Sequence, residues 1–348
     1  KSELLLPAGG MESVVAAVQN GADAVYLGGR QFSARQNAEN FDEEALEQAV
    51  RYCKARGVKI YQTLNTLLFD NQFAEAERAV RLACRIGIDA FIVQDWGVVR
   101  LIQTLAPDMP IHGSTQMSVH TLAGARLLKE AGLSRVVLAR EMSLDEIREI
   151  CKEADIETEV FIHGALCMSV SGQCYLSGML GTRSGNRGAC AGTCRLPFSL
   201  HGKRDEYALS LKDLCAQKQL EALCEAGVTS LKIEGRMKRP EYVAAAVTAY
   251  RAAADGRAAD RQLLEDLQAV FSRSGFTDGY YRGRRDAGLF GHRRREDVTA
   301  ATAEVFSRLH RLYDRENPRV PLALTFTMRA GEPVRLEGRS GDAAAQAA

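Results

Sequence analysis

Long apolar runs are absent from this sequence of 348 residues. A membrane-spanning helix needs roughly 18 or more consecutive apolar residues, and no stretch approaches that length. The opening segment, KSELLLPAGG, also lacks the pattern of a signal peptide. We therefore expect a cytoplasmic protein without a membrane partner. The missing initiator methionine and the alanine-rich end, GDAAAQAA, suggest a piece of a longer chain.

Several signatures of catalysis and nucleotide binding are missing as well. None of the six histidines is followed by glutamate, so the zinc-protease motif H-E-x-x-H does not occur, and neither does the hydrolase elbow G-x-S-x-G. No G-x-G-x-x-G follows the first expected strand, and no Walker A pattern is present. These absences give little support to proteolysis or to an open nucleotide-binding sheet.

Charge of one sign does not dominate, because the formal net charge is +1. Basic residues nevertheless gather in two stretches, residues 181–204 and 280–296. The first stretch contains no acidic residue and includes Arg183, Arg187 and Arg195. Arginines interleaved with glycine and aromatic residues suit a polyanionic partner such as RNA, so these three are candidate phosphate contacts. A solvated loop is the alternative.

What the sequence does contain is a regular alternation of apolar strands and amphipathic helices. Eight strands are expected, at residues 3–9, 22–29, 58–65, 88–95, 109–116, 134–141, 156–164 and 228–235. A helix is expected between consecutive strands and after the last one, including helices at 210–227 and 240–256. Eight such units in about 255 residues predict an α/β fold, a closed (β/α)8 TIM-like barrel.

Residues 256–348 do not follow this alternation. We expect one more helix at 261–273 and then a hairpin at 320–338 that turns near Ala330-Gly331. The predicted organisation is therefore a barrel over residues 1–255 and an extension over residues 256–348. This extension would be first helical and then β-rich, as the start of a further domain.

The nine cysteines argue against a disulfide framework, because their number is odd and they cluster unevenly. Five fall in expected helices, where the simplest interpretation is a small buried apolar side chain: Cys53, Cys84, Cys151, Cys215 and Cys224. The other four have the spacing C-x6-C-x15-C-x3-C within residues 164–198, here called the cysteine loop: Cys167, Cys174, Cys190 and Cys194. Structural zinc sites usually contain two close cysteine pairs, and only the last two are that close, which favours an iron-sulfur centre over zinc. Spacing alone leaves both metals open.

Polar side chains close most of the expected strands, and in a barrel these strand ends meet at one mouth. The candidate catalytic residues among them are Asp95, Gln116, Arg140, Glu141, His163, Glu234 and Arg236. Glu141 and Glu234 would hold or relay protons, because neighbouring arginines would keep them ionised. His163 would act as a general acid or base or support a ligand, with a packed histidine bonded to the backbone as the alternative.

The stretch EVFIHGALCMSVSGQC, residues 159–174, closely resembles the signature of the collagenase-like peptidase family of unassigned catalytic type, U32. ELLLPAGG, GADAVYLGG, GSTQMS, LAREMSLDEI and SLKIEGRMKRPEYV reinforce this resemblance, which covers roughly residues 2–290. Branches of that family are oxygen-independent hydroxylases that carry a [4Fe-4S] cluster. They form 5-hydroxycytidine in ribosomal RNA, form 5-hydroxyuridine at the tRNA wobble position with prephenate as the hydroxyl source, or hydroxylate a ubiquinone precursor.

The resemblance therefore implies an RNA-modifying hydroxylase that forms a 5-hydroxypyrimidine, with a [4Fe-4S] cluster held by the four cysteines of the cysteine loop. The hairpin at 320–338 resembles the start of the extra domain of longer family members. This favours ribosomal RNA cytidine as the target, with tRNA wobble uridine next and prephenate as a candidate co-substrate. The alternatives are a collagenase-like peptidase and a non-catalytic RNA-binding protein whose metal loop is structural. The oligomeric state is left open.

Overall fold

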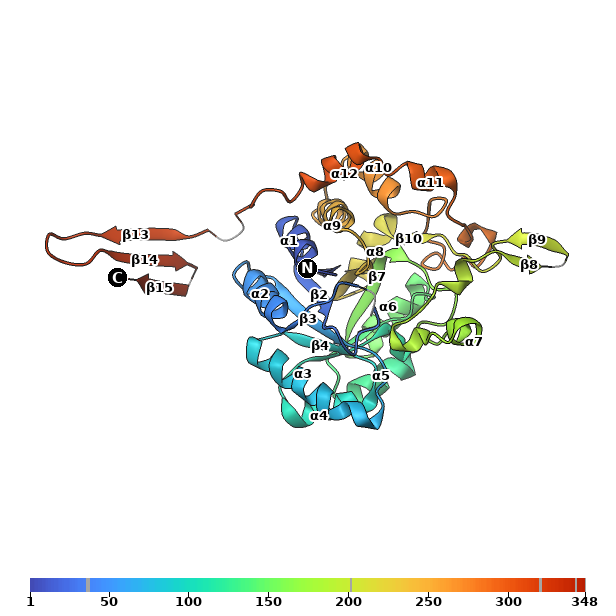
Figure 1. Ribbon diagram of the computed structural model, residues 1–348, viewed down its shortest axis with the longest axis horizontal. Coiled ribbons are helices and arrows are strands. Elements are labelled where there is room, and N and C mark those ends of the chain that lie inside the picture. Colours follow the sequence, from blue (N-terminus) through green and yellow to red (C-terminus); the bar gives the residue numbers. More distant parts are fainter. Residues whose placement is uncertain (36–37, 201, 319–320, 342, 348) are drawn as a thin grey trace. The chain divides into compact units, whose positions relative to one another are not determined.

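The computed structural model describes residues 1–35, 38–200, 202–318, 321–341 and 343–347 (Figure 1). The chain divides into two compact units, Lys1–Asp314 and Arg315–Ala348. None of the described helices is both long and apolar enough to cross a membrane.

The first unit is built around a closed parallel barrel. Its strands are β1 (Glu3–Pro7), β2 (Ala24–Gly28), β3 (Lys59–Leu64), β4 (Ala90–Val93), β5 (Ile111–Gly113), β6 (Arg135–Val137), β7 (Glu157–Ala165) and β11 (Ser230–Ile233). Strands β1 to β7 pair in chain order, and β11 pairs in parallel with both β7 and β1, which closes the barrel. The predicted (β/α)8 barrel is confirmed.

Helices cover the outside of the barrel (Figure 1). They are α1 (Met11–Gln19), α2 (Glu43–Lys54), α3 (Phe73–Ile86), α4 (Trp96–Leu105), α5 (Leu122–Glu130), α6 (Leu144–Glu153), α8 (Leu220–Glu225) and α9 (Pro240–Ala254). Local sequence sets several of their starts. The Asp42 side chain accepts a hydrogen bond from the backbone N–H of Ala45 at the start of α2, and Pro240 occupies the first turn of α9.

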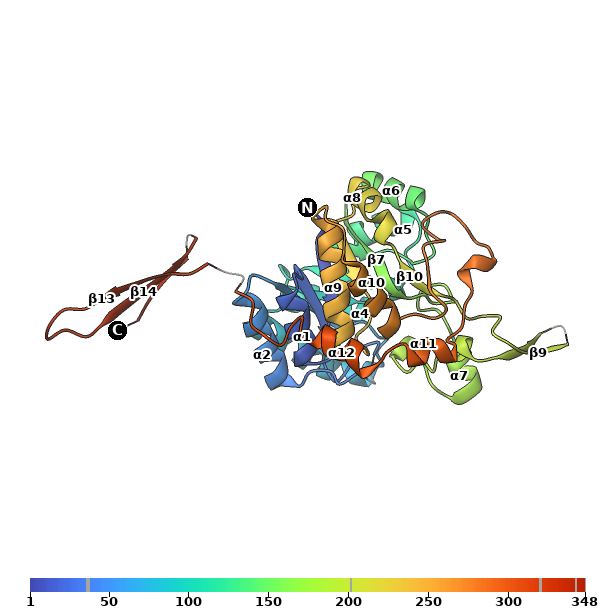
Figure 2. The same cartoon turned by 90° about the horizontal axis from the view of Figure 1, so that it is seen from above.

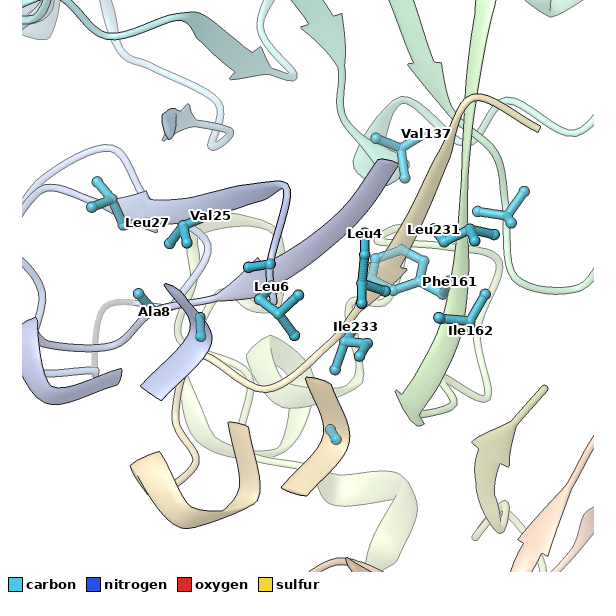
Figure 3. Close-up of a cluster of buried hydrophobic side chains, with 14 of the residues drawn as sticks. Leu4, Leu6, Ala8, Val25, Leu27, Val137, Phe161, Ile162, Leu231 and Ile233 are labelled. Atoms are coloured by element: carbon cyan, nitrogen blue, oxygen red, sulfur yellow. The ribbon is translucent and has the colours of Figure 1, made fainter. Parts of the chain in front are cut away.

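The main core lies between the strands and these helices. Figure 3 shows apolar side chains of β1, β2, β7 and β11 meeting there, among them Leu4, Leu6, Ile162 and Ile233. All four are almost completely buried. Burying such side chains is the dominant favourable contribution to folding, so this layer holds the strand ends that carry the polar residues in place.

The segment 210–227 differs from the single helix expected there. Residues Asp213–Cys215 form strand β10, and the α-helix begins only at Leu220. The reason is the length of β7, whose end extends beyond its pairing with β6 at Glu159 and offers free backbone groups on that edge. Strand β10 pairs antiparallel with that end, with Asp213 opposite Ala165, so Cys215 lies in a strand and not in a helix. A short strand, β12 (Phe276–Thr277), adds to β10 in parallel.

Helices α10 (Arg261–Val270), α11 (Arg295–Thr299) and α12 (Ala303–His310) complete the first unit. Figure 2 shows α10 and α12 beside α9, and both helices contact it. Phe271, just after α10, packs on Tyr242 of α9 with 4.7 Å between ring centroids. Apolar packing therefore joins this helical segment to the barrel, and the first compact unit extends to Asp314.

The second unit is an antiparallel sheet of β13 (Ala323–Thr327), β14 (Arg335–Ser340) and β15 (Ala343–Ala347). The hairpin expected at 320–338 is confirmed from residue 321 onward, since residue 320 lies outside the described residues. Gly331 has a φ of 82°, a left-handed conformation that glycine adopts without strain, and it lies between β13 and β14.

Candidate active site

The cysteine loop leaves the end of β7 and forms α7 (Leu176–Gly181) and two short 3-10 helices, Gly185–Arg187 and Thr193–Arg195. The hairpin of β8 (Phe198–Leu200) and β9 (Lys203–Glu206) follows, and β10 then returns the chain to β7. The loop is thus tied to the barrel at both ends. Figure 1 shows α7 and the hairpin at the side of the barrel that carries β7 and β10.

All four loop cysteines are free thiols, with Cys190 exposed and the other three half-buried. Burial raises the pKa of the Cys194 thiol, the charge of Arg195 opposes this effect, and the thiolates of Cys167, Cys190 and Cys174 raise it further. Each of the other three thiols therefore lies close enough to affect Cys194. The loop gathers its four sulfur atoms into one neighbourhood.

The chemistry of this group suits a metal or an iron-sulfur cluster. The backbone N–H of Leu176 donates to Cys174 Sγ and that of Gly192 donates to Cys190 Sγ, both at 3.4 Å. Hydrogen bonds of this kind to cysteine sulfur tune iron-sulfur centres. Among the described residues, no three cysteine, histidine or carboxylate side chains already stand in the arrangement of a metal site. Four cysteine thiols have the donor chemistry that such a group needs, and the sulfur atoms would have to move closer together to hold it.

A serine in the middle of the loop fastens it to the barrel rim. Ser171 donates from its backbone N–H and its hydroxyl to the two carboxylate oxygens of Glu141, both at 2.9 Å. The hydroxyl of Ser118 donates to the carbonyl oxygen of Ser171 at 2.9 Å. Two residues on, the Gln173 side chain donates to the carbonyl oxygen of Gln116 at 3.1 Å. Glu141 and Gln116 therefore hold the segment between Cys167 and Cys174.

Two of the three candidate phosphate contacts also fasten the loop. Arg187 donates to the carbonyl oxygen of Leu67 at 3.0 Å and to Gln72 Oε1 at 3.1 Å, and its guanidinium lies 4.1 Å from the centre of the Phe69 ring.

Arg195 donates to the carbonyl oxygens of Leu166 and Leu211, at the beginning and beyond the end of the loop. Arg183 differs, because it is exposed and its Nε–H donates to a carbonyl oxygen within the loop, that of Ala189 at 3.1 Å. Of the three arginines, Arg183 is the one left accessible to a ligand.

At the mouth, Glu234 is held between two arginines. Its carboxylate oxygens lie 2.5 Å from Arg35 Nη2 and 2.7 Å from Arg140 Nη2. Burial alone would raise the pKa of Glu234, but the charges of Arg140 and Arg35 outweigh it, and the pKa is lowered. Glu234 is therefore an ionised carboxylate in a buried site.

The same ion pair also acts on Arg35. Burial works to lower the pKa of Arg35, while the charge of Glu234 and its hydrogen bond raise it and prevail. Arg35 lies in the loop after β2, 199 residues before Glu234 in the sequence. The pattern of polar residues at strand ends therefore did not predict it.

The mouth holds more positive than negative charge. Arg236 is buried and donates to Thr63 Oγ1 at 3.2 Å, and burial together with the charge of Arg35 lowers its pKa to about 10. Burial also lowers the pKa of Lys238, and the charges of Asp213 and Glu234 oppose this effect. The charges that act on Glu234, Arg236 and Lys238 from neighbouring side chains are mostly positive, and they include those of Arg35, Arg140, Arg273 and Arg293.

Two buried donors in this neighbourhood are unused. Within the part of the chain that the structure describes, Arg140 Nε and Arg273 Nε have no hydrogen-bond partner. Buried polar groups in proteins are nearly always paired. Unused N–H groups beside an excess of cations indicate a place for an anionic ligand.

Two candidate catalytic residues lie apart from this group. The Asp95 carboxylate caps α4 by accepting from the backbone N–H groups of Gly97 and Val98 at 2.7 and 3.2 Å. His163 is completely buried, and burial lowers its pKa to about 3. One extra residue in β7 opposite β11 shifts the register here, since Lys232 pairs with Phe161 and Ile233 with His163.

This bulge turns His163 away from the mouth and into a set of aromatic rings. Its ring lies 5.1 to 5.9 Å from four neighbouring ring centroids: Tyr242, Tyr250, Phe271 and Phe276. Its Nδ1 lies 3.3 Å from the hydroxyl of Tyr250. The packed-histidine alternative accounts for this environment better than a role in proton transfer. Of the seven candidates, the structure therefore brings together Arg140, Glu234 and Arg236.

Comparison with known proteins identifies the family. Residues 9–290 match the model described as peptidase family U32. The tRNA hydroxylation protein P1 of Bacillus subtilis is 38% identical over 292 residues, which cover 78% of this chain and 69% of that protein. The 23S rRNA 5-hydroxycytidine C2501 synthase of Escherichia coli is 38% identical over 314 residues, which cover 87% of this chain and 47% of that protein.

A third relative bears a different name. The protein named collagenase from Porphyromonas gingivalis is 36% identical over 319 residues, which cover 84% of this chain and 76% of that protein. The chain thus spans about half the length of the ribosomal RNA synthase and more of the other two. Since the family model matches most of the sequence, and these relatives are each more than 30% identical to it, the chain belongs to peptidase family U32.

Proposed function

We propose that this protein is an iron-sulfur-dependent RNA hydroxylase that forms a 5-hydroxypyrimidine without molecular oxygen. The observations that carry the proposal are the four free thiols in one loop leaving β7 and the ionised Glu234 held by Arg35 and Arg140 at the barrel mouth. Two relatives named for hydroxylation of tRNA or of 23S rRNA support this reaction class.

Cytidine in ribosomal RNA is the favoured target, and wobble uridine in tRNA is the next. The alignment with the 23S rRNA 5-hydroxycytidine synthase covers 87% of this chain, against 78% for the tRNA hydroxylation protein of Bacillus subtilis. The longer match supports the ribosomal RNA target. The exposed Arg183 would contribute to holding a phosphate group.

Cys167, Cys174, Cys190 and Cys194 would hold a [4Fe-4S] cluster, which would supply redox chemistry or polarise a substrate group. Glu234, kept ionised by Arg140 and Arg35, is positioned to accept a proton or orient a hydroxyl group at the mouth. The excess of cations suits an anionic hydroxyl donor, and prephenate, a dicarboxylate, has the required chemistry. The buried Nε–H groups of Arg140 and Arg273 would reach its oxygens only after the mouth opened, because neither atom is exposed to solvent.

Metal analysis of protein purified without air is the first test. We expect iron and acid-labile sulfide in equal amounts, a brown colour and a broad absorbance band near 400 nm. A colourless protein with one zinc per chain would contradict the proposal. Mass spectrometry of ribosomal and transfer RNA from cells lacking the gene then identifies the target, because the corresponding 5-hydroxypyrimidine should disappear and return with a plasmid copy.

A peptidase is the second candidate, favoured by the relative named collagenase. Purified protein would then cleave gelatin, and Glu234→Gln would abolish the cleavage at a temperature where circular dichroism shows the variant still folded. Absence of cleavage, together with loss of the modified nucleotide on gene deletion, decides for the hydroxylase. A non-catalytic RNA-binding role would leave RNA modification unchanged in Glu234→Gln cells.

A further inference from the structure

A pocket open to solvent lies beside Cys174 in the cysteine loop. Seven residues of α7 and the turns around it line the pocket: Cys174, Tyr175, Gly178, Thr182, Ser184, Gly185 and Asn186. Only one of the four loop cysteines is among them, so the pocket is distinct from the space that all four thiols share. Nothing in the hydroxylase proposal so far uses it.

We propose that this pocket binds the base of an unpaired RNA nucleotide, with Tyr175 stacked on the face of the base and Arg183 close to its phosphate. This proposal rests on the proposed function, because it names how the RNA substrate would be held. It commits to single-stranded RNA, since a base can enter a side pocket only when it is not stacked and paired in a duplex.

Tyr175 has the properties of a stacking residue. Its side chain is 68% exposed, although it is a large aromatic residue. In the described part of the chain, its hydroxyl has no hydrogen-bond partner, so no internal contact explains its position. Aromatic rings exposed in this way are the usual platforms for bases in single-stranded nucleic acid, because every base has a flat face.

The other lining residues add polar groups and space. Thr182, Ser184 and Asn186 carry hydroxyl and amide groups, which can donate to or accept from the edge of a base. Gly178 and Gly185 have no side chains to fill the pocket. An apolar protein segment would gain little from these polar groups.

The charge of the surrounding chain suits a polyanion. No aspartate or glutamate occurs from Val160 to Arg204, which spans the whole cysteine loop. Arg183 is exposed one position after the lining residue Thr182, whereas Arg187 and Arg195 are engaged in fastening the loop. An exposed arginine next to a pocket with an aromatic ring suits one nucleotide, because the ring can stack on the base while the arginine contacts the phosphate.

Binding of a labelled single-stranded RNA oligonucleotide to the anaerobically purified protein tests the proposal. We expect Tyr175→Ala to raise Kd between about 5-fold and about 100-fold, the range typical for loss of one stacked base. Tyr175→Phe should recover most of the affinity, because it keeps the ring. Arg183→Ala should weaken binding and reduce the slope of log Kd against log salt concentration by about 1.

Met179→Ala is the matched control. Met179 lies in α7, which begins directly after Tyr175, and it is 80% exposed without lining the pocket. Its replacement should change Kd by less than about twofold, as expected for a surface substitution. An equal effect of Tyr175→Ala and Met179→Ala would overturn the proposal. So would a change in oligomeric state with Tyr175→Ala at unchanged RNA affinity, because the exposed face would then belong to a second copy.

Failure of this inference and failure of the proposed function give different results. Tyr175→Ala protein should keep its iron content and visible absorbance and should show a raised KM for RNA. If wild-type protein hydroxylates RNA and Tyr175→Ala has the same KM, only the base pocket is wrong. If wild-type protein neither carries iron nor modifies RNA, the proposed function itself is wrong.

Discussion

Glu141 receives two hydrogen bonds from Ser171, one from its backbone N–H and one from its hydroxyl, each 2.9 Å long. This pair joins the segment that follows β6 to the middle of the segment between Cys167 and Cys174. Both carboxylate oxygens are engaged, so Glu141 serves as an anchor for the loop. The carboxylate at the mouth that faces arginines is Glu234.

Replacing Glu141 with alanine should loosen the cysteine loop. Losing hydrogen bonds to a charged group costs about 1.5–3 kcal/mol, so iron release to a chelator should become roughly 10- to 100-fold faster if it requires the loop to open. Release can be followed by absorbance in an anaerobic chelator assay. Glu146→Ala is the control, since Glu146 takes the same two hydrogen bonds from Ser143 at 2.7 and 2.8 Å. Equal release rates in the two variants would contradict the anchoring role.

Glu234→Gln should leave the buried cations of the mouth without their main counter-charge. Removing one partner of a buried ion pair typically costs about 3–5 kcal/mol. We expect a lower melting temperature, and a larger rise on adding a dicarboxylate such as malonate than wild-type protein shows. Asp266→Asn, which breaks the pair with Arg308 away from the mouth, should lower stability without this malonate response. A response of the same size in all three proteins would argue against an anion site.

Substitution of single cysteines by serine should separate the loop cysteines from the rest. Cys167→Ser, Cys174→Ser, Cys190→Ser and Cys194→Ser should each lower bound iron well below the roughly four atoms of a [4Fe-4S] cluster. Cys224→Ser is the control, because Cys224 is exposed in α8 and lies outside the loop. Iron and sulfide assays provide the measurement. Full iron content in any loop variant would remove that cysteine from the ligand set.

His163 should make stability depend on pH on the acid side. Burial lowers its pKa to about 3 in the folded chain, whereas an unfolded histidine titrates near 6.5. Between these values the unfolded chain binds the extra proton, so stability falls as pH falls, by up to about 1.4 kcal/mol per pH unit well below pH 6.5.

Urea unfolding midpoints of wild-type protein and His163→Gln, compared from pH 7.5 to pH 5.0, isolate this contribution. The variant should lose less stability on acidification, and its RNA hydroxylation should persist. Parallel pH profiles would mean that folding does not lower the pKa of His163.

The barrel could be predicted because each strand and helix carries its own local pattern, as in the apolar run of β4 and the Pro240 start of α9. The gathering of Arg140, Glu234 and Arg236 followed from the rule that strand ends meet. Arg35 could not be found this way, since its contact with Glu234 depends on how a distant loop folds over the mouth.

Two other differences between the predicted and the observed structure also have local causes. One extra residue in β7 is enough to turn His163 away from the mouth, and no feature of composition announces such a bulge. Residues Asp213–Cys215 have a helical pattern, but the free edge of β7 offers them strand pairing. Tertiary pairing outweighs local preference in both places.

Strand β7 pairs with β11 along its first part and with β10 at its end. Everything from Leu166 to Lys212 therefore begins and ends on one strand, and the barrel strands can pair without it. Such an excursion behaves as an exchangeable cassette, whose length and sequence can vary while the scaffold stays constant. A chimera that carries this segment from a relative acting on another RNA would be expected to fold, and to transfer substrate preference together with its cysteines.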